Sequence, residues 1–341
     1  MEPERAHAPE PSSEHGATMK AIVRNTYGPP DVVELQEIEK PVAADDEVLV
    51  RVRASSVNPA DWYSMTGTPS VARVQMGLRR PKSNRLGVDF AGQVEAVGKD
   101  VTQFRPGDDV FGGRDGAFAE YVAVRAARAV VPKPANLTFE QAAAVPVAAL
   151  TALQGLRDKG QLQPGQAVLI NGASGGVGTF AVQIAKALGA EVTGVCSTRN
   201  VDLVRSLGAD HVIDYTRQDF TRSDRRYDLL LDVAGSRSWS EYRRVLNPQA
   251  TLVIVGGPKG NRLLGPLSHI VTLRLAAVRG SQKAGFFIAK FNQPDMGVLR
   301  ELLEAGKVTP VIDRRCELNE IADALRYLGE GHAQGKIVVT V

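Results

Sequence analysis

The stretch that decides the fold of this chain is AVLINGASGGVGTFAVQIAKALGAEVTGVC, residues 167–196. Its first residues, Ala167 to Ile170, are apolar and predict a buried strand. Gly178 to Leu188 has apolar residues at helical spacing, and Glu191 to Cys196 predicts a second strand. Strand, glycine-rich turn, helix and strand in this order predict a β-α-β unit with a parallel sheet.

The turn between the first strand and the helix has the composition of a phosphate-binding loop. Its glycines permit a tight bend and let backbone amides approach a pyrophosphate, whose charge is favoured at a helix N-terminus. A purely structural turn is the alternative, but the flanking strand and helix favour nucleotide binding. The candidate cofactor-binding residues of this turn are Asn171, Gly172, Ala173, Ser174, Gly175, Gly176, Val177 and Gly178.

The residues after the second strand indicate which nucleotide is bound. In dinucleotide folds an acidic residue about twenty positions beyond the loop commonly binds the 2′-hydroxyl of NAD. Here the chain has Ser197, Thr198 and Arg199 instead. Because these side chains offer hydroxyls and a guanidinium and no carboxylate, they favour the 2′-phosphate of NADPH over NADH. An arginine solvated at a strand end is the alternative.

On either side of this unit the chain divides into two kinds of pattern. Short alternating apolar runs separated by Gly and Pro predict a β-rich, partly barrelled domain over residues 19–138. Thr138 is a candidate N-cap of an Ala-rich helix that is expected to reach Leu156. From there strands and helices alternate, which predicts a doubly wound parallel sheet over 139–282. Residues 283–341 are expected to rejoin the first domain. Residues 1–18 are rich in Pro, Glu, Ser and His and predict a disordered extension.

Composition narrows the class of protein further. A chain of 341 residues exceeds what one core usually serves, so two domains with a cleft between them are expected. The net charge of +3 gives no reason to expect nucleic acid as a partner. We also expect no membrane span and no secretory signal, because no apolar run is long enough. The only cysteines, Cys196 and Cys316, fit a cytoplasmic protein without a disulfide framework.

Six motifs in the chain carry a resemblance to a known family. They are SSVNPAD at 55–61, LGVDFAG at 86–92, GDDV at 107–110, the glycine-rich turn, LGAD at 207–210 and GKIVV at 335–339. In this order they resemble the medium-chain dehydrogenase/reductase superfamily, over nearly all of Met19 to Val341. The resemblance implies an α/β architecture in which a GroES-like β-rich catalytic domain is joined to a Rossmann cofactor domain.

The resemblance to zinc enzymes of this superfamily breaks down at two positions. A cysteine ligand is replaced by Asn58 and a histidine ligand by Val88, and no cysteine cluster occurs elsewhere. Without a Lewis acid, an alcohol or a simple ketone is difficult to polarise. The chain is therefore more similar to the zinc-free, quinone-reductase branch, so we expect no metal site. That branch implies a small quinone or enone as substrate.

In the quinone-reductase motif an Asn and a Tyr face the nicotinamide, which implies catalytic roles for Asn58 and Tyr63. Tyr63 would donate a hydrogen bond or proton to the developing oxyanion, and Asn58 would orient the ring or ribose. Water in place of Tyr63, packing for Tyr63 and a turn role for Asn58 remain alternatives. The resemblance also places near the cofactor Thr151, Tyr215, Gly256, Phe286, Phe287, His332 and Lys336.

Several functional readings share these features. Quinone reduction comes first, followed by reduction of 2-alkenals or enones, and then by NADPH binding with little turnover. The basic residues Arg73, Arg79, Arg80, Lys82 and Arg85 either attract an anion or form a solvated loop. By resemblance we expect a homodimer whose sheet edge includes the apolar stretch Ile270 to Val278.

Overall fold

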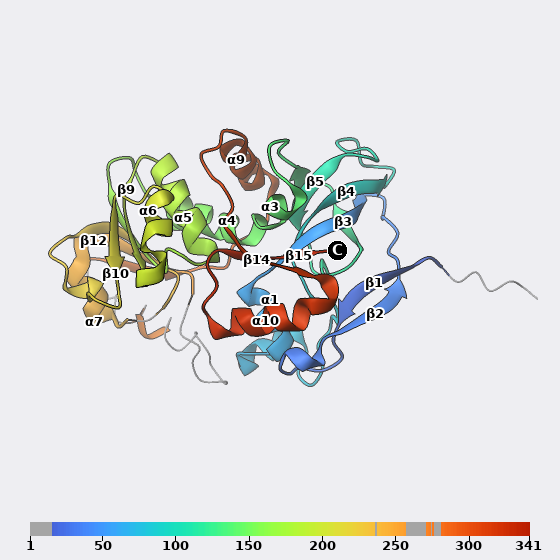
Figure 1. Cartoon of the computed structure of the whole chain (residues 1–341), viewed down its shortest axis with the longest axis horizontal. Coiled ribbons are helices and arrows are strands. Elements are labelled where there is room, and N and C mark those ends of the chain that lie inside the picture. The colour runs from blue at the N-terminus through green and yellow to red at the C-terminus, as the bar shows by residue number, and fades with distance from the viewer. Residues whose placement is uncertain (1–15, 236, 257–270, 274, 276–280) are drawn as a thin grey trace, which may run out of the picture.

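The computed structural model describes residues 16–235, 237–256, 271–273, 275 and 281–341. Within these ranges the chain forms two lobes, one built on a parallel sheet and one rich in antiparallel strands (Figure 1). The largest buried apolar cluster includes residues of both lobes. Val168 lies in the parallel-sheet lobe, whereas Phe111 and Met296 lie in the antiparallel lobe. The lobes therefore share packed apolar contacts.

The first lobe has six described strands in the order β10-β9-β8-β11-β12-β13, all parallel. Because the order reverses between β8 and β11, this is a doubly wound sheet with a ligand crevice expected at that point. The strands are β8 Ala167–Asn171, β9 Glu191–Cys196, β10 His211–Asp214, β11 Tyr227–Asp232, β12 Leu246–Ile254 and β13 Lys283–Phe286. Its helices are α4 Pro146–Leu153, α5 Gly176–Ala187, α6 Val201–Ser206 and α7 Trp239–Tyr242. The preceding helix, α3 Phe139–Ala143, packs against the antiparallel strands of the other lobe.

The second lobe is a sheet in the order β14-β15-β3-β4-β5-β7, with β6 paired to β3. Its strands are β3 Glu47–Val57, β4 Asp89–Val97, β5 Asp109–Gly113, β6 Tyr121–Arg125, β7 Val130–Pro132, β14 Ile312–Glu317 and β15 Lys336–Thr340. A hairpin of β1 Thr18–Val23 and β2 Glu34–Glu39 lies beside it. The helices are α1 Pro59–Thr66, α2 Arg73–Met76, α9 Gln293–Glu304 and α10 Ile321–Glu330. The C-terminal strands β14 and β15 thus return to the lobe where the chain begins (Figure 1).

The structure differs from the sequence expectations in three places. We expected the chain to leave the parallel sheet after residue 282, but β13 pairs with Thr251–Ile254 and extends the sheet to Phe286. The short strand escaped prediction because Gly285 interrupts its apolar pattern. The long helix expected after Thr138 is broken before Pro146, whose ring cannot continue it. Of the disordered extension predicted over 1–18, residues 1–15 lie outside the described residues. The prediction is wrong at its end, because Thr18 already pairs with Glu39 in β1.

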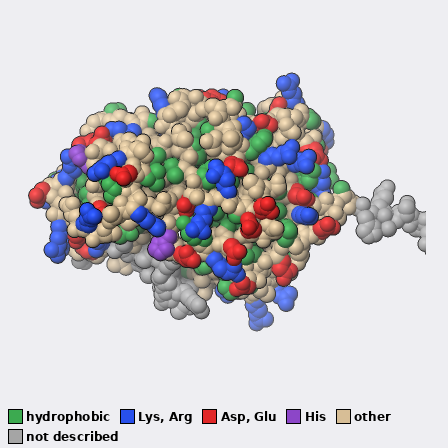
Figure 2. All heavy atoms as spheres, in the orientation of Figure 1, with side chains coloured by type: hydrophobic (Ala, Val, Ile, Leu, Met, Phe, Trp, Pro, Cys, Tyr) green, Lys and Arg blue, Asp and Glu red, His purple; other side chains and the backbone are tan. Residues whose placement is uncertain are grey.

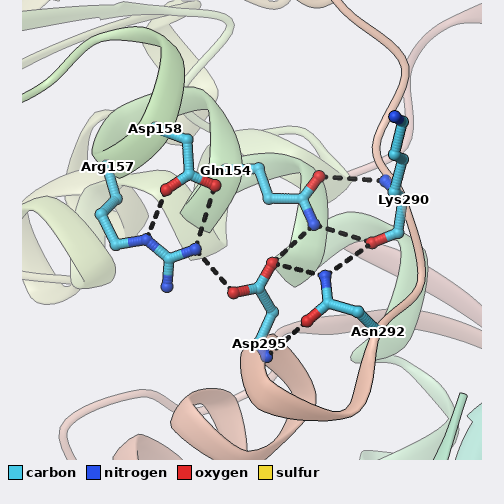
Figure 3. A network of polar contacts seen from close by, with 6 residues as sticks. All are labelled: Gln154, Arg157, Asp158, Lys290, Asn292 and Asp295. Atoms are coloured by element: carbon cyan, nitrogen blue, oxygen red, sulfur yellow. Dashed lines mark hydrogen bonds and ion pairs between the residues drawn. The ribbon is translucent and has the colours of Figure 1, made fainter. Parts of the chain in front are cut away.

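A polar network joins the two lobes where the chain leaves the parallel sheet (Figure 3). After α4 the helix ends in a π-helical turn, Gln154–Lys159. The Gln154 side chain donates to the carbonyl oxygen of Lys290 and accepts from its backbone amide. It also donates to Asp295, near the start of α9, at 2.7 Å. Arg157 pairs with the same carboxylate at 2.6 Å. These bonds fix α9 against the end of α4.

The face of the molecule drawn in Figure 2 carries charges of both signs. On the face in Figure 2, basic and acidic side chains are interspersed. No helix within the described ranges is both long enough and apolar enough to cross a membrane.

Candidate functional site

The glycine-rich turn lies at the end of β8, beside the point where the strand order reverses. Gly172 has a φ of +89°, a conformation that glycine adopts without strain. A Cβ on Gly178 would lie 2.1 Å from the carbonyl oxygen of Gly172, so only glycine allows α5 to approach the turn this closely. Gly175 is the N-cap of α5 and no side chain caps the helix in the described structure. Its first-turn amides and its dipole are therefore suited to a pyrophosphate.

A buried carboxylate holds the residues that flank this turn. Asp232, at the end of β11, is fully buried and accepts hydrogen bonds from Asn171 at 2.8 Å and from the Gly235 amide at 2.9 Å. It also accepts the hydroxyl of Tyr242 at 2.5 Å. Burial and the neighbouring charge of Asp232 raise the pKa of Tyr242, which stays protonated. Asn171 is thereby engaged within the protein and acts on the turn through its position.

The residues expected at the adenosine end of the cofactor come together beside the turn. Arg199 donates to the carbonyl oxygen of His332 at 2.8 Å, which joins two residues that are far apart in sequence. Thr198 donates to Asp214 at 2.6 Å, and this bond is the main cause that lowers the pKa of Asp214. Tyr215 follows Asp214 and is 55% exposed. Arg199 is exposed, so its guanidinium is accessible to a phosphate.

The two candidate catalytic residues flank the first turn of α1. Asn58 is its N-cap and is buried, whereas Tyr63 lies within the helix and is half-buried. Burial raises the pKa of Tyr63, so the phenol stays protonated at neutral pH. The Asn58 side chain is held by protein groups: it donates to Asp89 at 2.8 Å and accepts from Lys336 at 2.5 Å.

Asp61 closes the same helix N-terminus and titrates unusually. Its carboxylate accepts the backbone amides of Asn58 and Gly87, yet only 2% of the residue is exposed. Burial outweighs these bonds and raises the pKa of Asp61 from 3.8 to about 7. Between those two values the folded chain holds a proton on this carboxyl that the unfolded chain has lost.

This bound proton makes the stability of the fold depend on pH. Because the folded state binds more protons, the free energy of unfolding falls as pH rises from about 4 to 7 and then levels. Asp61→Asn keeps a hydrogen-bond acceptor but does not titrate. The free energy of unfolding should therefore differ by about 2 kcal/mol less between pH 5 and pH 7.5 in this variant than in the wild-type protein. Urea unfolding of both proteins at several pH values measures this, and parallel curves would contradict the shift.

The remaining residues expected near the cofactor differ in their surroundings. Thr151 uses its hydroxyl within α4, where it donates to the Val147 carbonyl at 2.6 Å. Gly256 follows β12, and a Cβ there would lie 2.0 Å from the Val233 carbonyl oxygen. Phe286 and Phe287 pack against two different core clusters, as successive residues of an extended chain do. The two rings therefore do not line the same side of one pocket.

The basic segment after Tyr63 is in part structural. Arg73 donates to the carbonyl oxygens of Gly67 and Thr66 and stacks on the ring of Tyr27. Arg85 is partly buried beside Arg114, and burial together with this neighbour lowers its pKa. Arg79, Arg80 and Lys82 are exposed.

Metal ligands do not gather at this site. Val88 is half-buried and apolar. The resemblance places it where the zinc-dependent enzymes have a histidine ligand. Within the ranges that the structure covers, no three His, Cys, Asp or Glu side chains come close enough to hold a metal ion.

Comparisons with known proteins agree with this geometry. Residues 44–135 match the family model described as alcohol dehydrogenase GroES-like domain, and 207–339 the one described as zinc-binding dehydrogenase. The chain is 35% identical to the NAD(P)H oxidoreductase RTN4IP1, mitochondrial, of Mus musculus, over 97% of this chain and 91% of that protein. It is 32% identical to the NADPH-dependent alkenal/one oxidoreductase, chloroplastic, of Arabidopsis thaliana, over 94% and 79%. The solved quinone oxidoreductase of Coxiella burnetii superposes with a TM-score of 0.82 at 31% identity, over 95% and 100%.

Proposed function

The chain belongs to the medium-chain dehydrogenase/reductase superfamily, in its quinone oxidoreductase-like branch, and on that premise we propose that it transfers hydride from NADPH to a quinone or similar conjugated carbonyl, without zinc. The observation that carries this proposal is the uncapped α5 N-terminus behind the tight turn at Gly172, which suits a dinucleotide pyrophosphate. Arg199, exposed at the adenosine end, supports the choice of NADPH.

The protein residues would position and protonate, and bound NADPH would supply the hydride. Tyr63 keeps its proton at neutral pH because burial raises its pKa, so it can donate a hydrogen bond to an oxyanion on the acceptor. The half-buried position of Tyr63 leaves its ring partly accessible. The absence of zinc is supported by Asn58 and Val88 at the positions of the usual ligands.

Turnover with a panel of acceptors tests the proposal. Purified protein is given NADPH, with NADH in parallel, and 1,4-benzoquinone, 9,10-phenanthrenequinone or a 2-alkenal. We expect NADPH-selective oxidation with the quinones. A preference for NADH would overturn the cofactor assignment. Tight NADPH binding without turnover on any acceptor would support the third reading, a binding protein with little activity.

The second candidate, reduction of an enone or alkenal, is favoured by the likeness to the alkenal/one oxidoreductase of Arabidopsis and by Tyr63. Both acceptors take up a proton after hydride transfer, but the enolate formed from an enone is far more basic than the hydroquinone anion formed from a quinone. Loss of the phenol hydroxyl should therefore cost more with enones than with quinones. Tyr63→Phe is expected to lower kcat/KM for a 2-alkenal about a hundredfold and for quinones less than threefold, in line with the size of general acid catalysis. Steady-state kinetics measures both.

A matched variant separates this effect from a general loss of a tyrosine hydroxyl. Tyr121 is half-buried in β6 of the same lobe, and its ring makes a cation–π contact with Lys40. Tyr121→Phe removes its hydroxyl and serves as the control. We expect Tyr121→Phe to leave both activities unchanged. Equal and negligible effects of Tyr63→Phe on the two acceptors would exclude a catalytic role for its phenol.

We also propose a cytoplasmic homodimer. Cys196 and Cys316 are free thiols, as a reducing compartment preserves them. Among the described strands β13 is the last of the parallel sheet, and a strand at a sheet edge can pair with a second copy. Of the apolar stretch Ile270 to Val278, Val271 and Leu275 are 54% and 68% exposed, while much of the rest lies outside the described residues. Light scattering and cell fractionation test these two statements.

A further inference from the structure

A buried carboxylate that the proposed function does not use lies between the lobes. Asp89, the first residue of β4, is fully buried. One of its oxygens accepts from Ser56 at 2.8 Å and from Asn58 at 2.8 Å and pairs with Lys336 at 3.3 Å. The other accepts the backbone amide of Val147, in the first turn of α4, at 2.9 Å. One carboxylate thus joins β3, β15 and α4.

Lys336 connects this carboxylate to the phosphate loop. The amide of Gly335 donates to the carbonyl oxygen of Ser174 at 2.9 Å, and Gly335 pairs with Gly175 in a short parallel bridge. The Lys336 stem passes within 3.2 Å of where a Cβ on Gly176 would lie. Its ammonium nevertheless reaches Asn58 and Asp89 and is only 3% exposed. One residue therefore touches both the expected pyrophosphate site and Asn58.

The orientation of the Asn58 amide follows from these two charges. Its nitrogen donates to Asp89, and its oxygen accepts from Lys336. Rotating the amide by half a turn would place nitrogen against the ammonium and oxygen against the carboxylate. Both contacts would then be repulsive. Asp89 and Lys336 together hold a single orientation.

We propose that Asp89 is a positioning residue that holds Lys336 and Asn58 in their productive arrangement while the phosphate loop is occupied. This rests on the proposed function, in which Asn58 lies against the nicotinamide. Asp89 touches neither substrate nor cofactor and acts through its two partners. Without its charge, the Lys336 ammonium is released from Asn58 but stays beside the loop, where a phosphate still attracts it. The expected defect is therefore in turnover and not in NADPH affinity.

Three variants and one control test this role in the full-length protein. Asp89→Asn keeps the shape of the side chain and removes its charge, Lys336→Met removes the partner, and the third variant combines the two. Asp295→Asn is the control, because Asp295 is also a buried carboxylate that links the lobes, through Arg157 and Gln154 (Figure 3), without contacting Asn58. We would measure four quantities for the wild-type protein and for each variant. They are kcat, the dissociation constant of NADPH, the fluorescence emission of bound NADPH and Tm.

For Asp89→Asn we expect kcat to fall at least tenfold while the NADPH dissociation constant stays within threefold of wild type. Lys336→Met should lower kcat similarly, and the double variant should be no slower than the slower single variant, because both act through one contact. Asp295→Asn should lower Tm but leave kcat within threefold. Losses that multiply in the double variant, or an Asp89→Asn protein as active as wild type, would overturn the proposal.

Failure of the proposed function would be visible separately. If the wild-type protein fails to oxidise NADPH with every acceptor tested, the enzymatic assignment fails. The emission of bound NADPH then decides the role of Asp89. A changed emission in Asp89→Asn, but not in Asp295→Asn, supports the proposed coupling. The same emission in all of these proteins overturns it.

Discussion

Gly178→Ala is expected to weaken NADPH binding by at least a hundredfold. The added Cβ would lie 2.1 Å from the Gly172 carbonyl oxygen and 2.7 Å from the Ala173 carbonyl carbon. Both are backbone atoms of the phosphate loop, so no side-chain rotation can relieve the clash. The start of α5 must move away from the turn, and the amides that would bind the pyrophosphate move with it. Fluorescence titration with NADPH measures the loss.

The control for this experiment is another helical glycine. Gly297 lies in α9, and a Cβ there has no atom within 4 Å. Gly297→Ala should therefore leave NADPH affinity unchanged and stabilise the protein by about 0.5–1 kcal/mol, the usual gain of alanine over glycine inside a helix. If Gly178→Ala bound NADPH as well as Gly297→Ala, the loop would not be the pyrophosphate site.

Arg199→Glu is expected to lower the ratio of kcat/KM for NADPH to that for NADH about a hundredfold. The arginine offers the exposed positive charge at the end of β9, and its replacement puts a carboxylate where a 2′-phosphate would lie. Repulsion and the lost charge-assisted bond act against NADPH, whereas a carboxylate can accept the 2′-hydroxyl of NADH. Steady-state kinetics with both cofactors gives the ratio.

Two results would separate cofactor recognition from structural support. Arg199 also donates to the carbonyl oxygen of His332, so its replacement loosens the segment before β15. A structural effect of this kind would lower activity with NADPH and NADH equally. Arg243→Glu, an exposed arginine of the same lobe after α7, makes the same charge change and should leave the ratio unchanged.

The elements around the glycine-rich turn could be predicted because their signals are local. The apolar run at Ala167, the glycines after Asn171 and the helical spacing beyond Gly178 each follow from neighbours in the sequence. Thr138 is likewise the N-cap that its position suggested, with Gln141 completing the capping box. By contrast, β13 is short and contains a glycine, and it becomes a strand only because β12 offers it an edge.

The candidate site shows the same division more sharply. The order of the motifs identified the family, and the residues after β9 suggested NADPH, because both are properties of short segments. The roles of Asp89 and Asp232 could not be predicted, since the sequence around an aspartate does not show which distant groups it will meet. Their roles come from partners such as Val147, which is 58 residues from Asp89, and Tyr242, which reaches Asp232 from α7.

The sequence by itself determined the doubly wound sheet, the glycine-rich turn and the family, because backbone periodicity and glycine conformations are set within a few residues. Only the tertiary structure decided which polar groups face one another. Lys336 lies 278 residues from Asn58, and the two meet because β15 pairs antiparallel with β3 and brings Ile337 opposite Val57. Burial then makes these contacts matter, since a charge removed from water must find its partner in the fold.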